Sequence, residues 1–202
     1  LAGAEMRNGS GDLTLTYNTD VVAGTADVQT LTVSALTAGT FDAGSVETIA
    51  IKGELAKSTL AAVKSSALKN VTIDSDQNLT ITAGLIFAAT GNAATLDGSV
   101  DASASTGKII VDTSGTASSL GITGGSGDDT IKMGGYLTTN DVVDGGAGTD
   151  TLTMAAASLD KEFTNVTNIE TVAYDAATAG VDLDVSKLSA GVTKIILDVS
   201  DA

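Results

Sequence analysis

Short stretches of alternating apolar and polar residues, each ended by glycine, aspartate, asparagine or serine, recur along the whole chain. Alternation with a period of two is the pattern of a β-strand, and the residues that end each stretch are typical of tight turns. Several distances between the centres of these stretches are close to 9 or to 18–22 residues, as from Ile131 to Leu152 and on to Val172. A coil of about 18–20 residues with two strands is typical of folds in which each coil packs on the next. We therefore predict an all-β chain folded as a parallel β-solenoid or β-roll with Gly-Asp turns.

The predicted strands share two or three alternating branched apolar residues followed by a turn residue. They cover residues 13–17, 30–36, 47–53, 70–76, 78–84, 108–115, 120–125, 129–135, 150–156, 170–176, 181–186 and 194–201. Two stretches favour short helices instead, because their apolar residues are spaced as on one helix face: 55–64 and, less clearly, 158–163.

A longer duplication overlies the coil pattern. Five blocks recur in the same order at offsets of 116 to 124 residues: GSGDLTL, DVVAGTAD, LTVSA, VETIA and NVTID correspond to GSGDDTI, DVVDGGAGTD, LTMAA, IETVA and KIILD. The duplication predicts a first unit at 1–75 with degenerate turn loops, connecting solenoid coils at 76–124, and a second unit at 125–202 with intact loops. Because the chain begins without Met and without a signal peptide, we expect a piece of a longer protein.

The residue types that the chain lacks exclude several classes of function. The absence of Cys and His excludes disulfides, cysteine nucleophiles, Ser-His-Asp triads and His-ligated zinc. Arg7 is the only arginine, the six aromatic residues are scattered, and no pair of carboxylates stands apart from the turns, so we expect no enzymatic activity. A net charge of −15 disfavours nucleic acid and anionic membranes as partners, and no run of 18 apolar residues offers a membrane span. The expected partners are cations.

Two nine-residue segments, 124–132 and 145–153, share the pattern G-G-x-G-x-D-x-U-x, in which U is apolar. The glycines let the backbone curl so that carbonyl oxygens point inward, and the aspartate adds an anionic oxygen. Calcium takes six to eight oxygen ligands and one such loop supplies about three, so each ion needs two loops. The segments begin 21 residues apart, which is one coil plus a small insertion at 136–140. We therefore predict one calcium ion between loops on adjacent coils.

The predicted side-chain ligands are Asp129 and Asp150. Asp128, Asp141 and Asp144 are expected to supply oxygens close by or at an adjacent site. The remaining predicted ligands are backbone carbonyl oxygens, those of Gly124, Ser126, Gly127, Gly145, Ala147 and Gly148. The alternative interpretation is that both segments are ordinary Gly-Asp turns of a glycine-rich β-protein.

At these residues the chain resembles RTX-type calcium-binding proteins. The V/I-E-T-I/V pattern at 46–49 and 169–172 and the Thr-, Ala- and Gly-rich, Cys-free composition resemble more narrowly the RTX-containing bacterial surface-layer proteins. The resemblance implies a calcium-stabilised structural β-solenoid that is exported by type I secretion through a C-terminal signal and assembles with copies of itself into an extracellular lattice. It also implies attachment to cell-surface polysaccharide through another part of the parent protein. Unlike the long nonapeptide arrays of RTX toxins and proteases, two nonapeptides imply that the other coils depend on packing alone.

Three further functions fit parts of the pattern. A stalk segment of a secreted RTX adhesin would share the calcium-stiffened repeats but would stay monomeric. An ice- or surface-binding solenoid would use T-x-T segments such as 14–16, 80–82 and 151–153, but these do not recur at one fixed period, which favours ordinary strand threonines. The calcium-binding part of a secreted enzyme is the third, and the chain offers little for its chemistry.

Overall fold

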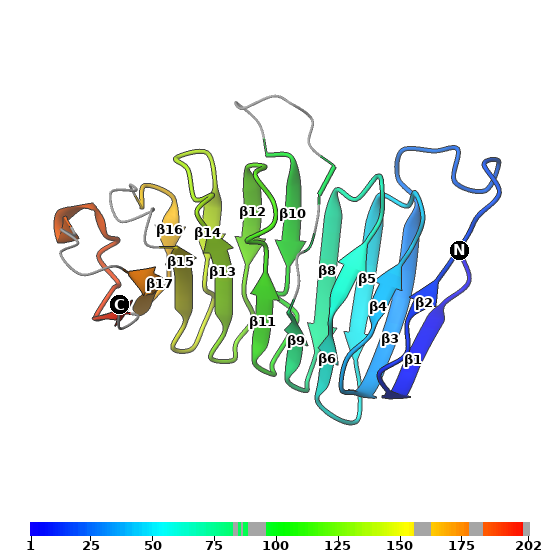
Figure 1. The fold of residues 1–202 in the computed structure, drawn as a ribbon, viewed down its shortest axis with the longest axis horizontal. Helices are drawn as coiled ribbons and strands as arrows, with labels where there is room; N and C mark the ends of the chain where they lie inside the picture. Colours follow the sequence, from blue (N-terminus) through cyan, green and yellow to red (C-terminus); the bar gives the residue numbers. More distant parts are fainter. Residues whose placement is uncertain (83–84, 86, 89–95, 156–162, 178–183, 200–202) are drawn as a thin grey trace.

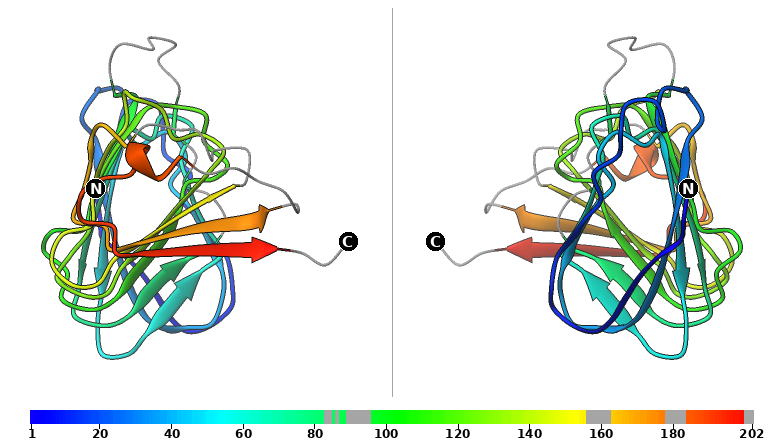
Figure 2. Two further views of the ribbon diagram at one scale, coloured as in Figure 1. Left: turned by 90° about the vertical axis from the view of Figure 1, so that its left-hand side faces the viewer. Right: turned by 90° about the vertical axis from the view of Figure 1, so that its right-hand side faces the viewer.

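The computed structural model describes residues 1–82, 85, 87–88, 96–155, 163–177 and 184–199. The chain winds into a parallel β-solenoid of about seven turns, as predicted from the sequence (Figure 1). Viewed along the solenoid axis, the coils enclose one common interior (Figure 2). Within the described residues no helix is long and apolar enough to cross a membrane.

Three sheets surround this interior, and all strand pairs between described residues are parallel. The eight-stranded sheet has the order β1 (Ala4–Gly9), β3 (Val28–Leu36), β5 (Thr48–Gly53), β8 (Asn70–Ser75), β10 (Gly98–Asp101), β12 (Leu120–Thr123), β14 (Val142–Asp144) and β16 (Val166–Thr167). The seven-stranded sheet has the order β18 (Lys194–Val199), β17 (Thr171–Ala177), β15 (Thr151–Ala155), β13 (Thr130–Gly134), β11 (Ile109–Asp112), β9 (Leu79–Ile81) and β6 (Ser58–Leu60). The three-stranded sheet contains β2 (Leu13–Thr14), β4 (Thr40–Asp42) and β7 (Ala62–Lys64).

The coils are slightly longer than the sequence predicts, and some contain three strands. Leu31 lies beside Ile51, and Ile51 beside Ile73, so these two coils take 20 and 22 residues. One coil carries β5, β6 and β7 in succession, each on a different sheet. Because a separation of 21 residues is an ordinary coil in this fold, the predicted insertion at 136–140 is not needed to align the two glycine-rich loops.

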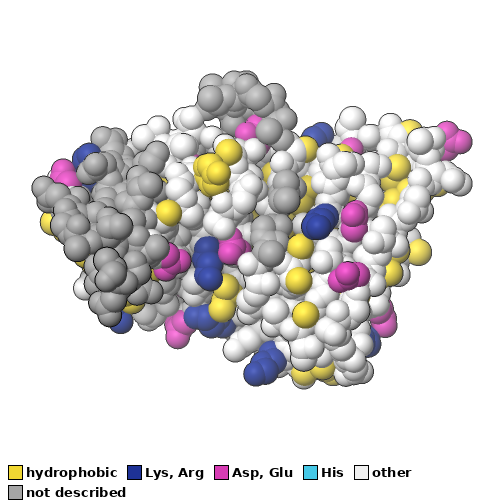
Figure 3. Space-filling view, in the orientation of Figure 1, with side chains coloured by type: hydrophobic (Ala, Val, Ile, Leu, Met, Phe, Trp, Pro, Cys, Tyr) yellow, Lys and Arg dark blue, Asp and Glu magenta, His cyan; other side chains and the backbone are white. Residues whose placement is uncertain are grey.

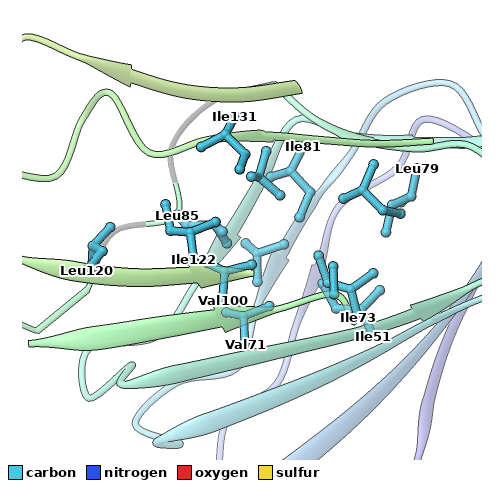
Figure 4. Close-up of a cluster of buried hydrophobic side chains, with 14 of the residues drawn as sticks. Ile51, Val71, Ile73, Leu79, Ile81, Leu85, Val100, Leu120, Ile122 and Ile131 are labelled. Atoms are coloured by element: carbon cyan, nitrogen blue, oxygen red, sulfur yellow. The ribbon is translucent and has the colours of Figure 1, made fainter. Parts of the chain in front are cut away.

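The interior is filled by branched apolar side chains that stack in columns from coil to coil. Val71, Val100 and Ile122 follow one another on the eight-stranded sheet and face Ile81 and Ile131 from the seven-stranded sheet (Figure 4). All five are almost completely buried. Each such side chain contributes about 1.5–3 kcal/mol on burial, and this packing keeps adjacent coils in register.

The helix predicted at 55–64 is wrong, because β6 and β7 occupy this stretch. The chain turns a corner between them at Ala61, whose N–H donates to the Gly39 carbonyl over 2.8 Å. Leu60 and Val63, on either side of the corner, are both buried in the interior. Leu60 belongs to β6 and Val63 to β7, and each strand directs one of these side chains into the interior. The resulting spacing of three residues resembles the spacing of apolar residues on one face of a helix.

Other predictions near the C-terminus have mixed outcomes. Residues 158–162 of the second predicted helix, and 181–183 of a predicted strand, lie outside the described residues. The end of that strand is instead a 3₁₀ turn, Val185–Lys187, begun by Asp184, whose side chain accepts from the Ser186 N–H over 3.0 Å. The described residues contain no α-helix.

The two copies of the internal duplication lie on different faces of the solenoid. Blocks 31–35, 46–50 and 70–74 of the first copy include parts of β3, β5 and β8 of the eight-stranded sheet. Their counterparts include parts of β15, β17 and β18 of the seven-stranded sheet. In both copies successive blocks occupy adjacent coils. The sequence offset between the two copies, however, does not correspond to a whole number of coils. Corresponding blocks therefore keep the same order along the solenoid but lie on different sheets.

Candidate metal centre

The two glycine-rich loops form one corner of the solenoid, which we name the Gly-Asp corner. Loop 124–129 connects β12 to β13, and loop 145–150 connects β14 to β15. Because β13 and β15 pair in parallel with Thr130 beside Thr151, the two loops lie on adjacent coils. Backbone hydrogen bonds join them directly, as from the Ala147 N–H to the Gly125 carbonyl over 3.0 Å. The structure thus brings together the two segments that the sequence singled out.

A column of carboxylates runs through this corner with one member on each coil: Asp129, Asp150 and Glu170. Asp129 Oδ1 accepts from the Ile109 N–H over 2.7 Å, and Asp150 Oδ1 accepts from the Asp129 N–H over 2.7 Å. Glu170 Oε2 accepts from the Asp150 N–H over 2.7 Å. Each carboxylate therefore caps a backbone N–H of the preceding coil that the turn leaves without a strand partner.

Two members of the carboxylate column are buried, and burial raises their pKa values. Asp129 and Asp150 are each 1% exposed. Burial raises the pKa of Asp129 and, with the nearby charges of Asp129 and Glu170, raises the pKa of Asp150 to about 7. Like charges in a desolvated column are costly, and a cation placed among them would offset that cost.

The two aspartates differ in how their second oxygen is satisfied. Asp129 Oδ2 accepts from the Gly125 N–H over 2.6 Å. Asp150 Oδ2 is buried and has no hydrogen-bond partner among the described residues. A buried carboxylate oxygen without a partner is rare and costs free energy, unless an ion or a proton compensates it. Asp150 is therefore the stronger candidate ligand of the pair.

The predicted carbonyl ligands are free to coordinate. Between described residues, no hydrogen bond is accepted by the carbonyls of Gly124, Ser126, Gly127, Gly145, Ala147 and Gly148. Two of these carbonyls point at glycines of the neighbouring coil. A Cβ added at Gly124 would lie 2.1 Å from the Gly145 oxygen, and one added at Gly148 would lie 2.5 Å from the Gly127 oxygen. Only glycine permits this approach of one coil to the next.

The three remaining predicted aspartates are placed differently. Asp128 is exposed, and its Oδ1 accepts from the Thr149 N–H over 2.9 Å. Asp144 is half-buried and accepts from the Gly146 N–H over 3.0 Å. Both therefore border the Gly-Asp corner. Asp141 lies at the opposite end of β14, where it accepts from the Leu120 N–H over 2.6 Å, so the structure does not bring it to the corner.

The donor set of the Gly-Asp corner fits a hard cation held mainly by backbone oxygens. Among the described residues, no three or more His, Cys, Asp or Glu side chains gather as a metal-binding group. Calcium accepts carbonyl oxygens alongside few carboxylates and tolerates flexible geometry. The buried Asp150 oxygen and the free carbonyls of both loops match that preference, whereas they would not suit a metal that needs nitrogen or sulfur ligands.

Glu170 is a member of the column that the sequence analysis missed as a site residue. A signal was present, because the V/I-E-T-I/V pattern occurs in both copies of the duplication. In the first copy Glu47 Oε2 accepts from the Asp27 N–H over 3.1 Å, and Asp27 Oδ2 is likewise buried without a partner among the described residues. The repeated glutamate therefore caps an aspartate of the preceding coil in both copies. The first copy lacks the paired glycines that complete the corner in the second.

Several threonines that are unevenly spaced in the sequence align on successive coils of the solenoid. One column of the seven-stranded sheet, on the side of the strands turned away from the interior, contains Thr59, Thr80, Ile110, Thr130, Thr151, the buried Thr171 and, at its end, Lys194. Their unequal spacing in the sequence results from one long coil, since Leu79 pairs with Ile109. The missing fixed period in the sequence therefore does not exclude a threonine array. The adjacent outward column contains Asp112 and Lys132, which interrupts a flat threonine surface.

Charged side chains are scattered over the face of the solenoid shown in Figure 3. Lysine and acidic side chains lie apart from one another there, with hydrophobic side chains and other atoms between them. Comparisons with protein-family models, curated proteins and solved structures give no match for this chain. The geometry of the Gly-Asp corner is therefore the feature that bears on function.

Proposed function

We propose that this chain is a calcium-stabilised structural segment of a bacterial surface layer, a β-solenoid that folds outside the cell and assembles into an extracellular lattice. The observation that supports it is the buried oxygen of Asp150 in a corner where two nonapeptide loops stack with free carbonyls. A structural role also fits the chain as a whole, because its described residues form one continuous stack of coils.

Bound calcium supplies positive charge to a desolvated corner that is otherwise anionic. Asp150 would hold it through Oδ2, Asp129 would contribute the remaining lone pairs of its carboxylate, and the loop carbonyls would complete the set. An ion that binds only the folded chain adds about 2.7 kcal/mol of stability at a hundredfold excess over Kd. At low calcium inside the cell, the charge of −15 and the many glycines favour an open chain that can be exported.

The first experiment is a thermal melt followed by far-ultraviolet circular dichroism in EDTA, in millimolar calcium and in millimolar magnesium. We expect a calcium-specific rise in Tm for the unmodified chain. The variant Asp129→Ala with Asp150→Ala should lose this rise. Because Asp129 also caps backbone N–H groups, Asp129→Asn with Asp150→Asn, which keeps acceptor oxygens, should fold better and lose the rise as well.

The matched control is Asp74→Ala with Asp175→Ala, which removes two exposed carboxylates from β8 and β17. It should keep the calcium-dependent rise, since neither residue lies in the Gly-Asp corner. An unchanged rise in both variants of Asp129 and Asp150 would contradict the site. No rise in the unmodified chain would favour ordinary Gly-Asp turns.

A stalk segment of a secreted adhesin is the second candidate, because the coils stack along a single axis as a stiff rod requires. Electron microscopy after calcium addition separates the two. Sheet-like arrays support the surface layer, whereas monomers that only stiffen in small-angle X-ray scattering support the stalk.

A further inference from the structure

A groove with a volume of about 590 Å³ lies on the seven-stranded sheet, on the side turned away from the interior. It crosses β6, β9 and β11, which stand side by side in Figure 1, and coils lie on both sides of it along the solenoid. The coil before β6 contributes no strand to this sheet, and its residues 35–37 form one end of the groove. We name it the Lys-Thr groove, after two columns of side chains that line it: Lys57, Asn78 and Lys108, and Thr59, Thr80 and Ile110.

The first column has one member on each of three successive coils, directly before each strand. The Ser58 N–H donates to the Asn78 carbonyl over 2.9 Å, and the Leu79 N–H donates to the Lys108 carbonyl over 3.0 Å. These bonds hold Lys57, Asn78 and Lys108 in register. Because neighbouring strands are about 4.8 Å apart, the backbones at Lys57 and Lys108 are about 9.6 Å apart.

Both lysines of the groove are available to an anion. Among the described residues, the ion pairs within 4 Å all involve Arg7, so no carboxylate neutralises either lysine at contact distance. The described lining residues include no acidic side chain, although the chain carries a net charge of −15. On the next coil Asp129 accepts from the Ile109 N–H over 2.7 Å, so the positive part of the groove ends at Lys108, beside the Gly-Asp corner.

Uncharged hydrogen-bonding groups lie between the two lysines. Asn78 Oδ1 accepts from the Lys108 backbone N–H over 3.2 Å, which fixes the side-chain amide and leaves its NH₂ group to donate elsewhere. The half-buried hydroxyls of Thr59 and Thr80 make no hydrogen bond between described residues. Each hydroxyl can both donate and accept. The groove therefore offers two positive charges with neutral donors and acceptors between them.

The backbone of β6 adds a donor and an acceptor at the same place. The Thr82 N–H donates to the Leu60 carbonyl over 3.0 Å, so Leu60 directs its backbone groups toward β9. By the alternation of a strand, Thr59 directs its N–H and C=O to the other side, where β6 has no partner strand among the described residues. That side is the end of the groove formed by residues 35–37.

We propose that the Lys-Thr groove binds a linear acidic saccharide, a glycan that carries a carboxylate on alternate sugars and runs along the solenoid axis across β6, β9 and β11. Lys57 and Lys108 each bind one carboxylate, since their separation of two coils is close to the length of two sugar units. Thr59 and Thr80 bond the hydroxyls of the sugar between them, and Ile110 packs against ring carbons. This inference goes beyond the proposed function and does not depend on calcium.

The sparse charge of the groove favours a saccharide over other polyanions. A nucleic acid carries a phosphate on every unit, which the net charge of −15 repels, and the described lining has no aromatic side chain on which a base could stack. An acidic peptide that added a strand would need several free edge residues, whereas β6 offers Thr59 alone. A saccharide requires hydroxyl, amide and ammonium groups at intervals, as the groove presents them.

The test is isothermal titration calorimetry in EDTA at low ionic strength, with a hyaluronan hexasaccharide as the probe. In this probe a glucuronate alternates with an uncharged sugar. The unmodified chain should bind it and should not bind chitohexaose, which has no carboxylate. Lys57→Gln with Lys108→Gln should weaken binding about tenfold, because it removes both charges. The matched control is Lys52→Gln with Lys69→Gln, which removes the same charge from exposed positions of the eight-stranded side and should keep the affinity.

A second pair of variants separates a saccharide site from a simple anion site. Thr59→Val with Thr80→Val removes both hydroxyls, keeps β-branched residues in the strands and should weaken binding about fivefold. Thr130→Val with Thr151→Val changes the same column outside the groove and should keep the affinity.

Three results would overturn the proposal. The first is no binding of the hyaluronan probe by the unmodified chain. The second is an equal loss of affinity in either pair of variants and its control, which would mean attraction without a defined site. The third is equally tight binding, through the same lysines, of a Glu-Ser peptide with the same number of carboxylates, which would make an acidic peptide the occupant.

The outcome for the groove is independent of the outcome for the Gly-Asp corner. Binding of the probe in EDTA, together with no calcium-dependent rise in Tm, would support the groove and contradict the calcium site. A calcium-dependent rise without binding of the probe would do the reverse.

Discussion

Asp150→Asn in the absence of calcium is the most direct probe of the Gly-Asp corner. The substitution removes the buried charge and keeps an oxygen that can accept from the Asp129 N–H, which now bonds Asp150 Oδ1 over 2.7 Å. It also replaces the unpartnered Oδ2. We expect the variant to be more stable than the unmodified chain at pH 8 in EDTA.

The magnitude follows from the pKa of Asp150, which burial raises to about 7 in the folded chain. An unfolded aspartate has a pKa of about 3.9, so between these values the folded state binds more protons than the unfolded state. The stability contributed by Asp150 is therefore full below about pH 4 and is lost as the pH rises to about 7. Three pKa units correspond to about 4 kcal/mol. This pKa already includes the hydrogen bond that the charged carboxylate accepts from the Asp129 N–H, so removing the charge should stabilise the chain by about 4 kcal/mol.

The assay is urea unfolding followed by circular dichroism, in EDTA, at pH 8 and at pH 4. The gain should be about 4 kcal/mol at pH 8 and should vanish at pH 4, where the carboxyl is neutral in the folded chain. Asp74→Asn, on the exposed side of β8, is the control and should change stability by less than about 0.5 kcal/mol.

A variant less stable than the unmodified chain at pH 8 in EDTA would refute the reasoning, because it would mean that the Asp150 charge is compensated without a metal. Saturating calcium should reverse the order of the two proteins, since the amide is a poorer ligand for the ion than the carboxylate.

Two further predictions concern packing at and beside the Gly-Asp corner, and the same urea assay measures both. Gly145→Ala should destabilise the chain by more than about 3 kcal/mol, because the new Cβ would lie 1.9 Å from the Asn168 carbonyl oxygen. Gly135→Ala, with no atom within 4 Å of the new Cβ, should change little, and equal effects at the two glycines would contradict the close stacking. Tyr174→Phe should stabilise the chain by about 1 kcal/mol, because it removes a buried hydroxyl that has no partner among the described residues. A loss of stability would reveal a partner for that hydroxyl.

Most strands of four or more residues could be predicted from local pattern, although β1 and β10 were missed, and several of the shorter strands could not. The run at 70–76 corresponds to β8, and the run at 108–115 contains β11, because alternation over four or more residues is a strong local signal. β14 and β16 were missed, since two or three residues are too few to show a period. They exist because the neighbouring coils supply their hydrogen-bond partners.

In the candidate site, too, the residues with a local sequence pattern could be predicted, and the residue that depends on a neighbouring coil could not. The glycines and aspartates of loops 124–129 and 145–150 are recognisable because the turn needs those residue types at fixed short spacing. Glu170 was not recognisable as a site residue, because its role depends on lying one coil beyond Asp150 and accepting from its N–H. A contact between coils has no signature within either coil.

The sequence alone determined that the chain is a parallel β-solenoid with two glycine-rich aspartate loops, since alternation and turn chemistry act over a few residues. The tertiary structure decided which sheet each strand joins and how the carboxylate column and the threonine column align. The physical reason is that coil length varies, with Leu31 beside Ile51 but Val71 beside Val100, so sequence spacing does not set the register. The register is set by apolar columns packed across the interior, between residues that are distant in the chain.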